Sequence, residues 1–254
     1  MKVLVVNVNT TQSMTEAIAA RARQAAAPGT EIEALTPHFG PASVEGNMES
    51  YLSAVAVMDR VLAYDGPYDA VIQAGFGEHG REGLQELLDV PVVDITEAAA
   101  HLAMLIGRTY SVITTLDRAV PQIEDRLALA GLLGRCASVR ASGLPVLELE
   151  QNPDRAVKEI AEQAVRAVRD DRAEVIVLGC GGMAGLEEAV RERAGVPVLD
   201  GTAAAVKLAE SLTGLGLSTS KIRTYAPPRP KPMTAWPLGA QLGLWHPREA
   251  RTRS

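Results

Sequence analysis

The 254-residue sequence contains only two cysteines, no long hydrophobic run and no excess of positive charge. Two cysteines, Cys136 and Cys180, provide neither a disulfide framework nor a metal cluster. No stretch approaches the roughly 20 apolar residues of a membrane-spanning helix, and the apolar run at 2–8 is too short for a signal peptide. A net charge of −6 disfavours nucleic acid as a partner, because nucleic acid requires a basic surface. We therefore expect a cytoplasmic protein that binds no metal, no nucleic acid and no membrane.

Hydrophobic runs that alternate with helical segments predict an α/β fold with mostly parallel sheets and helices on both faces. With 47% hydrophobic residues, the chain can form the core of one large or two small domains. Ser13 and Glu16 have the spacing of a capping box and predict the start of a helix. The expected strands cover 2–8, 31–36, 69–74, 90–95, 110–115, 145–150, 174–179 and 196–200, with further helices near 49–63 and 80–88.

An internal repeat gives the domain organisation. Segment 69–107 resembles segment 173–214, and the alignment places Gly75 on Cys180. We predict two similar α/β domains related by a pseudo-twofold axis, with the active site in the cleft between them. The first domain would comprise 1–96 plus about 203–224, the second 97–202, and a Pro-rich C-terminal arm 225–254. Ligands of parallel sheets bind outside the carboxyl ends of the strands, where both glycine-rich turns lie.

The turn Cys180-Gly181-Gly182 suits proton transfer without a cofactor. Inversion of a carbon beside a carbonyl needs a base on one face and an acid on the other. Backbone N–H groups at the start of a helix lower the pKa of a cysteine and can hold an enolate oxygen. Cys180 is therefore a candidate catalytic residue, with Gly181 and Gly182 as candidate substrate-binding residues.

Several motifs together resemble the hydantoin racemases, within the wider aspartate/glutamate racemase superfamily. They are "GCGGM" (179–183), "VNVNTTQSMT" (6–15), "FGPASVEG" (39–46), "VITTLDRAVPQIEDRL" (112–127) and "DGTAAAVKLAESLTGLGLSTSK" (200–221). The resemblance implies two α/β domains, no cofactor and a homo-oligomer. It also implies racemisation of a small molecule, a 5-substituted hydantoin, allantoin or a related amino-acid derivative.

The resemblance also implies two catalytic cysteines, one in each half, and this chain has only the second. The family's first site reads roughly Ala-Cys-Phe-Gly-Asp-Pro-Gly, whereas 74–80 reads Ala-Gly-Phe-Gly-Glu-His-Gly, with Gly75 in place of the cysteine. The Pro-Asn-Thr of the family is Val8-Asn9-Thr10 here.

Four interpretations of Gly75 are open. It can be an introduced removal of the cysteine. The protein can be a racemase whose other base is His79 or Glu78, and a histidine pKa near 6.5 suits proton transfer. It can be a one-cysteine decarboxylase or lyase like the arylmalonate decarboxylases, which pair a glycine with one cysteine. It can also be a ligand-binding homologue without catalysis.

A rival interpretation is a dinucleotide site. Gly75-x-Gly77-x-x-Gly80 follows a strand, and Asp94 stands near the position of a ribose-binding acid. The repeat copy lacks this glycine spacing but keeps Asp200, so we interpret both aspartates as structural.

The remaining candidates are residues at the strand ends and in nearby turns. They could bind a substrate ring or its polar groups: Asn9, Thr10, Phe39, Gly75, Phe76, Gly77, Thr114 and Thr115. We interpret Cys136 as structural, and Arg118 and Arg126 as part of a solvated face.

Overall fold

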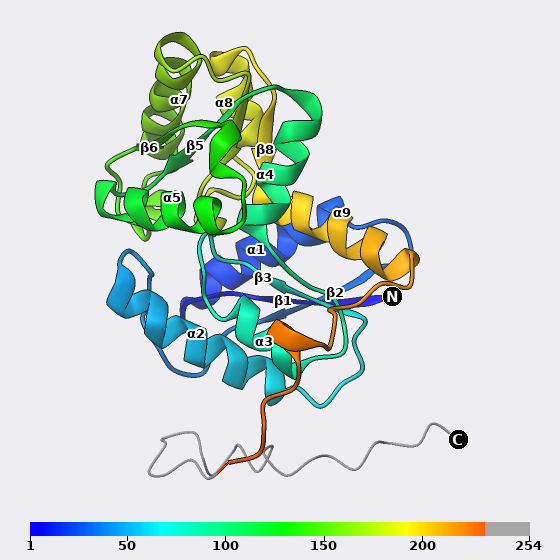
Figure 1. The fold of residues 1–254 in the computed structure, drawn as a ribbon. Helices are drawn as coiled ribbons and strands as arrows, with labels where there is room; N and C mark the ends of the chain where they lie inside the picture. Colours follow the sequence, from blue (N-terminus) through cyan, green and yellow to red (C-terminus); the bar gives the residue numbers. More distant parts are fainter. Residues whose placement is uncertain (232–254) are drawn as a thin grey trace.

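The computed structural model describes residues 1–231, and two parallel four-stranded sheets form its frame (Figure 1). The strands of the first sheet are β1 (Lys2–Val6), β2 (Glu31–Leu35), β3 (Ala70–Gln73) and β4 (Val92–Asp94). Those of the second sheet are β5 (Tyr110–Thr114), β6 (Cys136–Ala141), β7 (Val175–Leu178) and β8 (Val198–Asp200). The strand orders, β2-β1-β3-β4 and β6-β5-β7-β8, are equivalent. The α/β fold class and the two similar halves are thus confirmed.

Helices follow most strands, as parallel pairing requires. The α-helices are α1 (Gln12–Ala25), α2 (Asn47–Leu62), α3 (Arg81–Leu87), α4 (Ile95–Ile106), α5 (Val120–Leu129), α6 (Glu148–Gln151), α7 (Pro153–Asp170), α8 (Glu187–Ala194) and α9 (Gly201–Gly214). Short 3₁₀ helices are η1 (Asp117–Ala119), η2 (Leu133–Arg135), η3 (Gly181–Met183) and η4 (Arg223–Tyr225).

Helices α4 and α9 hold the two sheets together. Each begins after a strand-end aspartate whose carboxylate accepts backbone N–H bonds: Asp94 from Thr96 and Glu97, and Asp200 from Ala203. Such N-caps satisfy N–H groups that the first helical turn leaves free. The repeat therefore uses its paired aspartates in the same structural way, as we expected from the sequence.

The main hydrophobic core lies between the sheets. It includes valines of β1, β5 and β7 and small buried alanines of α4 and α9, which let these helices approach closely (Figure 1). A Cβ atom at Gly201 would lie only 2.7 Å from the carbonyl oxygen of Ile95, so glycine is needed at this contact. Two further clusters cover the outer faces, one under α2 and the other under α7.

Two local predictions are wrong. The expected strand 145–150 is a turn that leads into α6, and the fourth strand of the second sheet is β6. Every residue of β6 is only half-buried, so its sequence lacks the strong hydrophobic pattern of an inner strand. The expected capping box is also absent, because the Ser13 hydroxyl donates a hydrogen bond to Glu150 at 2.8 Å instead of capping α1.

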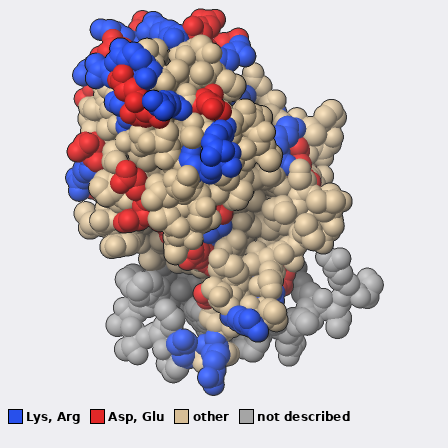
Figure 2. Space-filling model, turned by 45° about the horizontal axis from the view of Figure 1, so that its top comes forward, with Lys and Arg blue, Asp and Glu red and all other residues tan. Residues whose placement is uncertain are grey.

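Charged side chains gather over the half of the molecule that carries α7 and α8, while much of the remaining visible surface is uncharged (Figure 2). Within residues 1–231, none of the helices has the length and hydrophobicity of a membrane span. Most of the expected C-terminal arm, 232–254, lies outside the described residues. The division into domains at 96 and 203 stays a prediction.

Candidate active site

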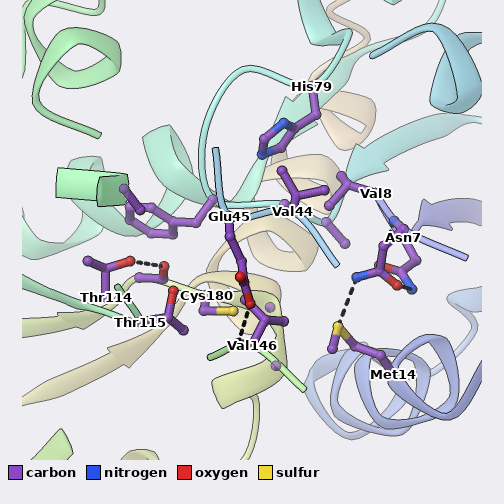
Figure 3. A pocket seen from close by; sticks show the side chains of 18 of the residues that line it. Asn7, Val8, Met14, Val44, Glu45, His79, Thr114, Thr115, Val146 and Cys180 are labelled. Atoms are coloured by element: carbon purple, nitrogen blue, oxygen red, sulfur yellow. Dashed lines mark hydrogen bonds between the residues drawn. The ribbon is translucent and has the colours of Figure 1, made fainter. Parts of the chain in front are cut away.

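A cavity lies between the carboxyl ends of the two sheets, where the sequence predicts a ligand site. The space between the strand ends amounts to about 570 Å³ when the part open to solvent is included. Strand ends and glycine-rich turns of both sheets form its wall (Figure 3). The lining residues are Asn7, Val8, Asn9, Met14, Val44, Glu45, Ala74, Gly75, Phe76, His79, Thr114, Thr115, Ala119, Gln122, Ile123, Val146, Gly179, Cys180, Gly181 and Gly182.

Cys180 follows β7 and is half-buried in this cavity. The turn after it approaches the first sheet closely, because a Cβ atom at Gly181 would lie 2.7 Å from the Ala74 carbonyl oxygen. The two glycine-rich turns therefore meet, as the repeat predicts.

The expected low pKa of Cys180 is wrong. Burial raises the pKa of the thiol to about 11, although the backbone N–H groups of Gly182 and Met183 favour the thiolate. The charge of Glu45 also raises this pKa. In the free protein, Cys180 is therefore a neutral thiol at neutral pH.

Two other side chains fill the space beside Gly75, where the resemblance predicts a cysteine. A Cβ atom at Gly75 would lie 2.5 Å from Cδ2 of His79 and 2.5 Å from Cγ1 of Val8. His79 belongs to the turn between β3 and α3, and its imidazole enters the cavity beside Val8 (Figure 3). A side chain at position 75 would therefore collide with the imidazole.

His79 is 5% exposed, and burial lowers its pKa to about 4. The charge of Asp94 and the carbonyl of Phe76 act in the opposite direction. His79 is therefore neutral at physiological pH, as a proton acceptor must be.

Glu78, the other candidate base, does not line the cavity. Its carboxylate accepts backbone N–H bonds from Gly80 and Glu82 at the start of α3. Burial raises the pKa of Glu78, and its other carboxylate oxygen, Oε2, is buried without a hydrogen-bond partner among the described residues.

A rigid polar network lies at the end of β1. Asn7 donates hydrogen bonds to Asn9 at 2.9 Å and to Thr15 at 3.0 Å. Asn9 accepts a bond from the Thr11 N–H at 3.0 Å and directs its amide nitrogen to the sulfur of Met14 at 3.1 Å. These contacts fix the amide groups in one orientation at the cavity wall.

Across the cavity, Thr114 ends β5 and Thr115 follows it. The Thr114 hydroxyl donates a hydrogen bond to the Gly179 carbonyl at 3.2 Å (Figure 3). Thr115 also lines the cavity and is buried. Within the described residues, its hydroxyl has no hydrogen bond, so it is available to a ligand.

The loop before α2 extends over the cavity and contacts the second sheet. Glu45 accepts a hydrogen bond from the Val146 N–H at 2.8 Å, and its side chain runs from the loop toward Cys180 (Figure 3). Thr10 and Thr11 hold the same loop through the carbonyls of Pro41 and Ala42. Glu45 is the only charged residue in the cavity wall of the described chain when His79 is neutral.

Three predicted binding residues do not line the cavity. Thr10 instead supports the loop before α2 through its hydrogen bond to the Pro41 carbonyl. Phe39 lies in the same loop and is exposed. Gly77 lies beside the His79 ring, where a Cβ atom would be 3.1 Å from Nε2, and its N–H donates to Thr96. The predicted residues that do line the cavity are Asn9, Gly75, Phe76, His79, Thr114, Thr115, Cys180, Gly181 and Gly182.

The dinucleotide interpretation finds no support in the geometry. Asp94 has a fully buried side chain that caps α4 and pairs with Arg126 at 3.0 Å and Arg81 at 3.3 Å. The interpretation of Arg126 as a solvated residue is wrong, because it is 4% exposed and α5 carries it into this ion-pair cluster.

Burial raises the pKa of Cys136 to about 12, which agrees with a structural role for this residue.

Four residues that line the cavity were not selected from the sequence: Asn7, Val8, Glu45 and Gln122. Val8 and Glu45 do lie in the motifs "VNVNTTQSMT" and "FGPASVEG", so those motifs could have pointed to them. Within the described residues, no group of three or more His, Cys, Asp or Glu side chains is placed to hold a metal ion.

Comparison with known proteins agrees with this geometry. The Asp/Glu/Hydantoin racemase family matches residues 3–209. A hydantoin racemase of Rhizobium meliloti is 40% identical over 91% of this chain and 96% of its own. A hydantoin racemase of Pseudomonas sp. (strain NS671) is 38% identical over 91% of this chain and 93% of its own.

Solved structures extend the comparison. The allantoin racemase of Pseudomonas fluorescens superposes with a TM-score of 0.91 at 71% identity, over 92% of this chain and 99% of its own. The allantoin racemase of Klebsiella pneumoniae gives a TM-score of 0.91 at 39% identity, over 97% and 99%. An arylmalonate decarboxylase gives a TM-score of 0.55 at 20% identity, over 88% and 98%, and shares the fold.

Proposed function

The chain belongs to the Asp/Glu/Hydantoin racemase family, and from this premise we propose that it racemises allantoin, with Cys180 and His79 acting on opposite faces of the substrate. It is a racemase of the hydantoin type. The observation that supports the assignment of the two residues is the space beside Gly75, because the His79 imidazole lies where a side chain at this position would stand.

The charge of the cavity wall favours a neutral substrate. Among the described residues, no Lys or Arg lines the cavity, and Glu45 is its one carboxylate. A free amino acid or a malonate carries carboxylates, which would meet Glu45 without a basic partner, and an unpaired buried charge is costly. Allantoin and the 5-substituted hydantoins are neutral cyclic ureides with several N–H donors. Glu45, Thr115 and the amide groups at the end of β1 can accept or donate hydrogen bonds to such a ring.

The two neutral groups form a complementary acid–base pair. His79 takes the proton from C5, the ring carbon beside the carbonyl, and the electron pair of the C–H bond moves into the enolate. The Cys180 thiol then gives its proton to the opposite face of C5. This leaves the enantiomer, a thiolate and an imidazolium, and transfer of a proton from imidazolium to thiolate restores the enzyme. The opposite enantiomer follows the same steps in reverse.

Backbone N–H groups would stabilise the enolate. Those of Gly182 and Met183 already face the Cys180 sulfur and favour negative charge there. Preorganised donors of this kind stabilise charge that develops only in the transition state. The reaction as proposed uses only this chain's own side chains and amides, without a cofactor.

A one-cysteine decarboxylase remains the second candidate, because Gly75 and Cys180 repeat its pairing. The same absence of a lining Lys or Arg within the described chain counts against it, since decarboxylation of a malonate begins with a dianion. We also propose a homo-oligomer, supported by the exposed apolar residues Met48, Tyr51 and Leu52 on α2. The cytoplasmic location stays a prediction.

A substrate panel tests the function. Single enantiomers of allantoin, 5-benzylhydantoin and glutamate are followed by polarimetry, and an arylmalonate is followed by CO2 release. We expect loss of rotation with allantoin, a smaller effect with 5-benzylhydantoin and none with glutamate. Cys180→Ser should abolish the effect and Cys136→Ser should keep it. Stereoselective CO2 release, with allantoin unchanged, would overturn the proposal in favour of the decarboxylase.

A further inference from the structure

Glu45 joins the two halves of the molecule across the cavity. It lies in the loop before α2, in the first half, and its Oε1 atom accepts a hydrogen bond from the Val146 N–H of the second half at 2.8 Å. Both residues line the cavity, and the Glu45 side chain runs from the loop toward Cys180 (Figure 3). The carboxylate is therefore held beside the thiol that acts on the substrate.

The backbone around Glu45 is fixed at several points. The N–H of Glu45 donates a hydrogen bond to Oε2 of Glu49, in the first turn of α2, at 3.0 Å. The next residue, Gly46, lies directly against Arg118 of η1, because a Cβ atom there would be 2.5 Å from Nη2 of the guanidinium. The Thr11 hydroxyl donates to a backbone carbonyl earlier in the loop at 2.7 Å. A carboxylate held in this way loses little conformational entropy when it binds a ligand.

One carboxylate oxygen of Glu45 is uncommitted. Val146 uses Oε1, and in the part of the chain that the structure describes no hydrogen bond or ion pair engages Oε2. The amide oxygens of Asn7 and Asn9, also in the cavity wall, already accept backbone N–H bonds at 3.4 and 3.0 Å. An ionised carboxylate can only accept hydrogen bonds, so Glu45 selects for a ligand that carries a donor.

We propose that Glu45 is the specificity-determining residue of the cavity, and that its carboxylate accepts the N1–H of the hydantoin ring, the N–H bonded to the carbon that is racemised. The proposal rests on the proposed function in one respect, that the substrate is a cyclic ureide. It adds one required donor to the general affinity for such a ring, and it does not depend on which group acts on the face opposite Cys180.

The position of Glu45 relative to Cys180 selects N1–H over N3–H. The charge of Glu45 is near enough to raise the pKa of the Cys180 thiol, and this thiol must reach C5. In a hydantoin ring N1 is bonded directly to C5, whereas the C4 carbonyl separates N3 from it. An acceptor beside Cys180 is therefore closer to N1–H than to N3–H.

This hydrogen bond would also change the electrostatic environment of the thiol. A donor that approaches Glu45 offsets part of the negative charge that disfavours the thiolate. The pKa of Cys180 should then be lower in the complex than in the free protein, where burial and Glu45 both raise it. The thiol thus gives up its proton more readily when a ring with N1–H is bound, so recognition of the substrate favours the proton transfer.

Calorimetric titration of the full-length protein with three achiral rings tests the required donor. Hydantoin carries both N–H groups, 1-methylhydantoin lacks N1–H and 3-methylhydantoin lacks N3–H, and racemisation alters none of them. The wild-type protein should bind hydantoin and 3-methylhydantoin with affinities within about threefold of each other. It should bind 1-methylhydantoin about tenfold to 150-fold more weakly, the factor that a hydrogen bond to a charged group represents.

Two substitutions of Glu45 separate the lost donor from a steric effect of the methyl group. In Glu45→Gln, the bond to the Val146 N–H requires the amide oxygen, so the NH2 group would face N1–H, donor against donor. This variant should bind hydantoin and 3-methylhydantoin at least about tenfold more weakly than the wild type does. Glu45→Ala removes the acceptor and opens space, so it should bind 1-methylhydantoin as tightly as hydantoin.

Ser13→Ala is the matched control. The Ser13 hydroxyl donates to Oε2 of Glu150 at 2.8 Å and forms another side-chain bond between the halves, from α1 to α6, but Ser13 does not line the cavity. This variant should keep the wild-type preference among the three rings. It thereby separates recognition by Glu45 from a general loosening of the contact between the halves.

The outcomes distinguish this role of Glu45 from the proposed function. If the wild type binds no hydantoin, or binds hydantoin and 1-methylhydantoin equally, the role of Glu45 is overturned, even where allantoin is racemised. The same holds if Glu45→Ala prefers hydantoin as strongly as the wild type does. A protein that distinguishes the rings as expected, but racemises neither allantoin nor 5-benzylhydantoin, would uphold the role of Glu45 and overturn the assigned reaction.

Discussion

A methyl group at position 75 should destabilise this protein by a predictable amount. In Gly75→Ala, the new Cβ would lie 2.5 Å from His79 Cδ2 and 2.5 Å from Val8 Cγ1. Carbon atoms in contact are normally about 3.5–4.0 Å apart, so both side chains would have to retreat by about 1 Å. Overpacking of this kind costs about 1–3 kcal/mol. For a chain of this size the melting temperature should fall by about 2–4 °C for each kcal/mol.

The cause is separated from other effects by a thermodynamic cycle. Thermal unfolding is measured for Gly75→Ala in the wild-type background and in Val8→Ala/His79→Ala, where the obstructing atoms are gone. Gly75→Ala should lower the free energy of unfolding less in the Val8→Ala/His79→Ala background than in the wild type. The difference should be at least about 1 kcal/mol, as expected for residues in contact. Gly134→Ala is the control, because a Cβ there meets nothing within 4 Å. An equal cost in both backgrounds would refute the view that His79 and Val8 fill the space beside Gly75.

Three further predictions concern charge. The pKa of His79 falls from about 6.5 in the unfolded chain to about 4 in the folded protein, so protonation favours unfolding. The free energy of unfolding should be highest above pH 6.5 and should fall by up to about 3 kcal/mol toward pH 4. Denaturant titrations over this pH range should show a shallower decline for His79→Gln. The charge of Glu45 raises the pKa of Cys180, so Glu45→Gln should increase the fraction of thiolate. Iodoacetamide at pH 8.5 should then alkylate Cys180 faster than in the wild type, while Cys136 reacts at its former rate. An unchanged rate for Cys180 would contradict this influence of Glu45. Arg126→Met should lower the free energy of unfolding in urea by about 3 kcal/mol, because it removes a buried partner of Asp94 and Glu97. A loss below about 1 kcal/mol would show that Arg81 alone compensates both carboxylates.

The repeat made the fold predictable from the sequence. Equivalent strand ends at Gly75 and Cys180 required equivalent turns, and the shared capping aspartates Asp94 and Asp200 followed from the same alignment. These features depend on local hydrophobic and capping patterns, which one sequence records. The half-buried strand β6 was missed because an edge strand needs no continuous hydrophobic run.

The contacts of the site were less predictable because they join distant segments. His79 lies four residues beyond Gly75, and only the path of the turn through Gly77, with its φ of +140°, brings the imidazole back to that point. Arg126 looked like a surface charge, yet it lies 32 residues from its partner Asp94 and is buried against it. The high pKa of Cys180 follows from burial by both halves and not from its own turn.

The most direct test of the account is α-proton exchange of each allantoin enantiomer in D2O, followed by NMR together with chiral separation. The wild-type protein should introduce deuterium into both enantiomers with inversion. His79→Gln should stop racemisation, and it should still exchange one enantiomer with retention only at high pH, where the Cys180 thiol ionises and can take the proton on its face. Cys180→Ser should confine exchange to the other enantiomer, for which His79 remains. If His79→Gln racemises allantoin at the wild-type rate, Cys180 and His79 are not the two acid–base groups, and the central claim is wrong.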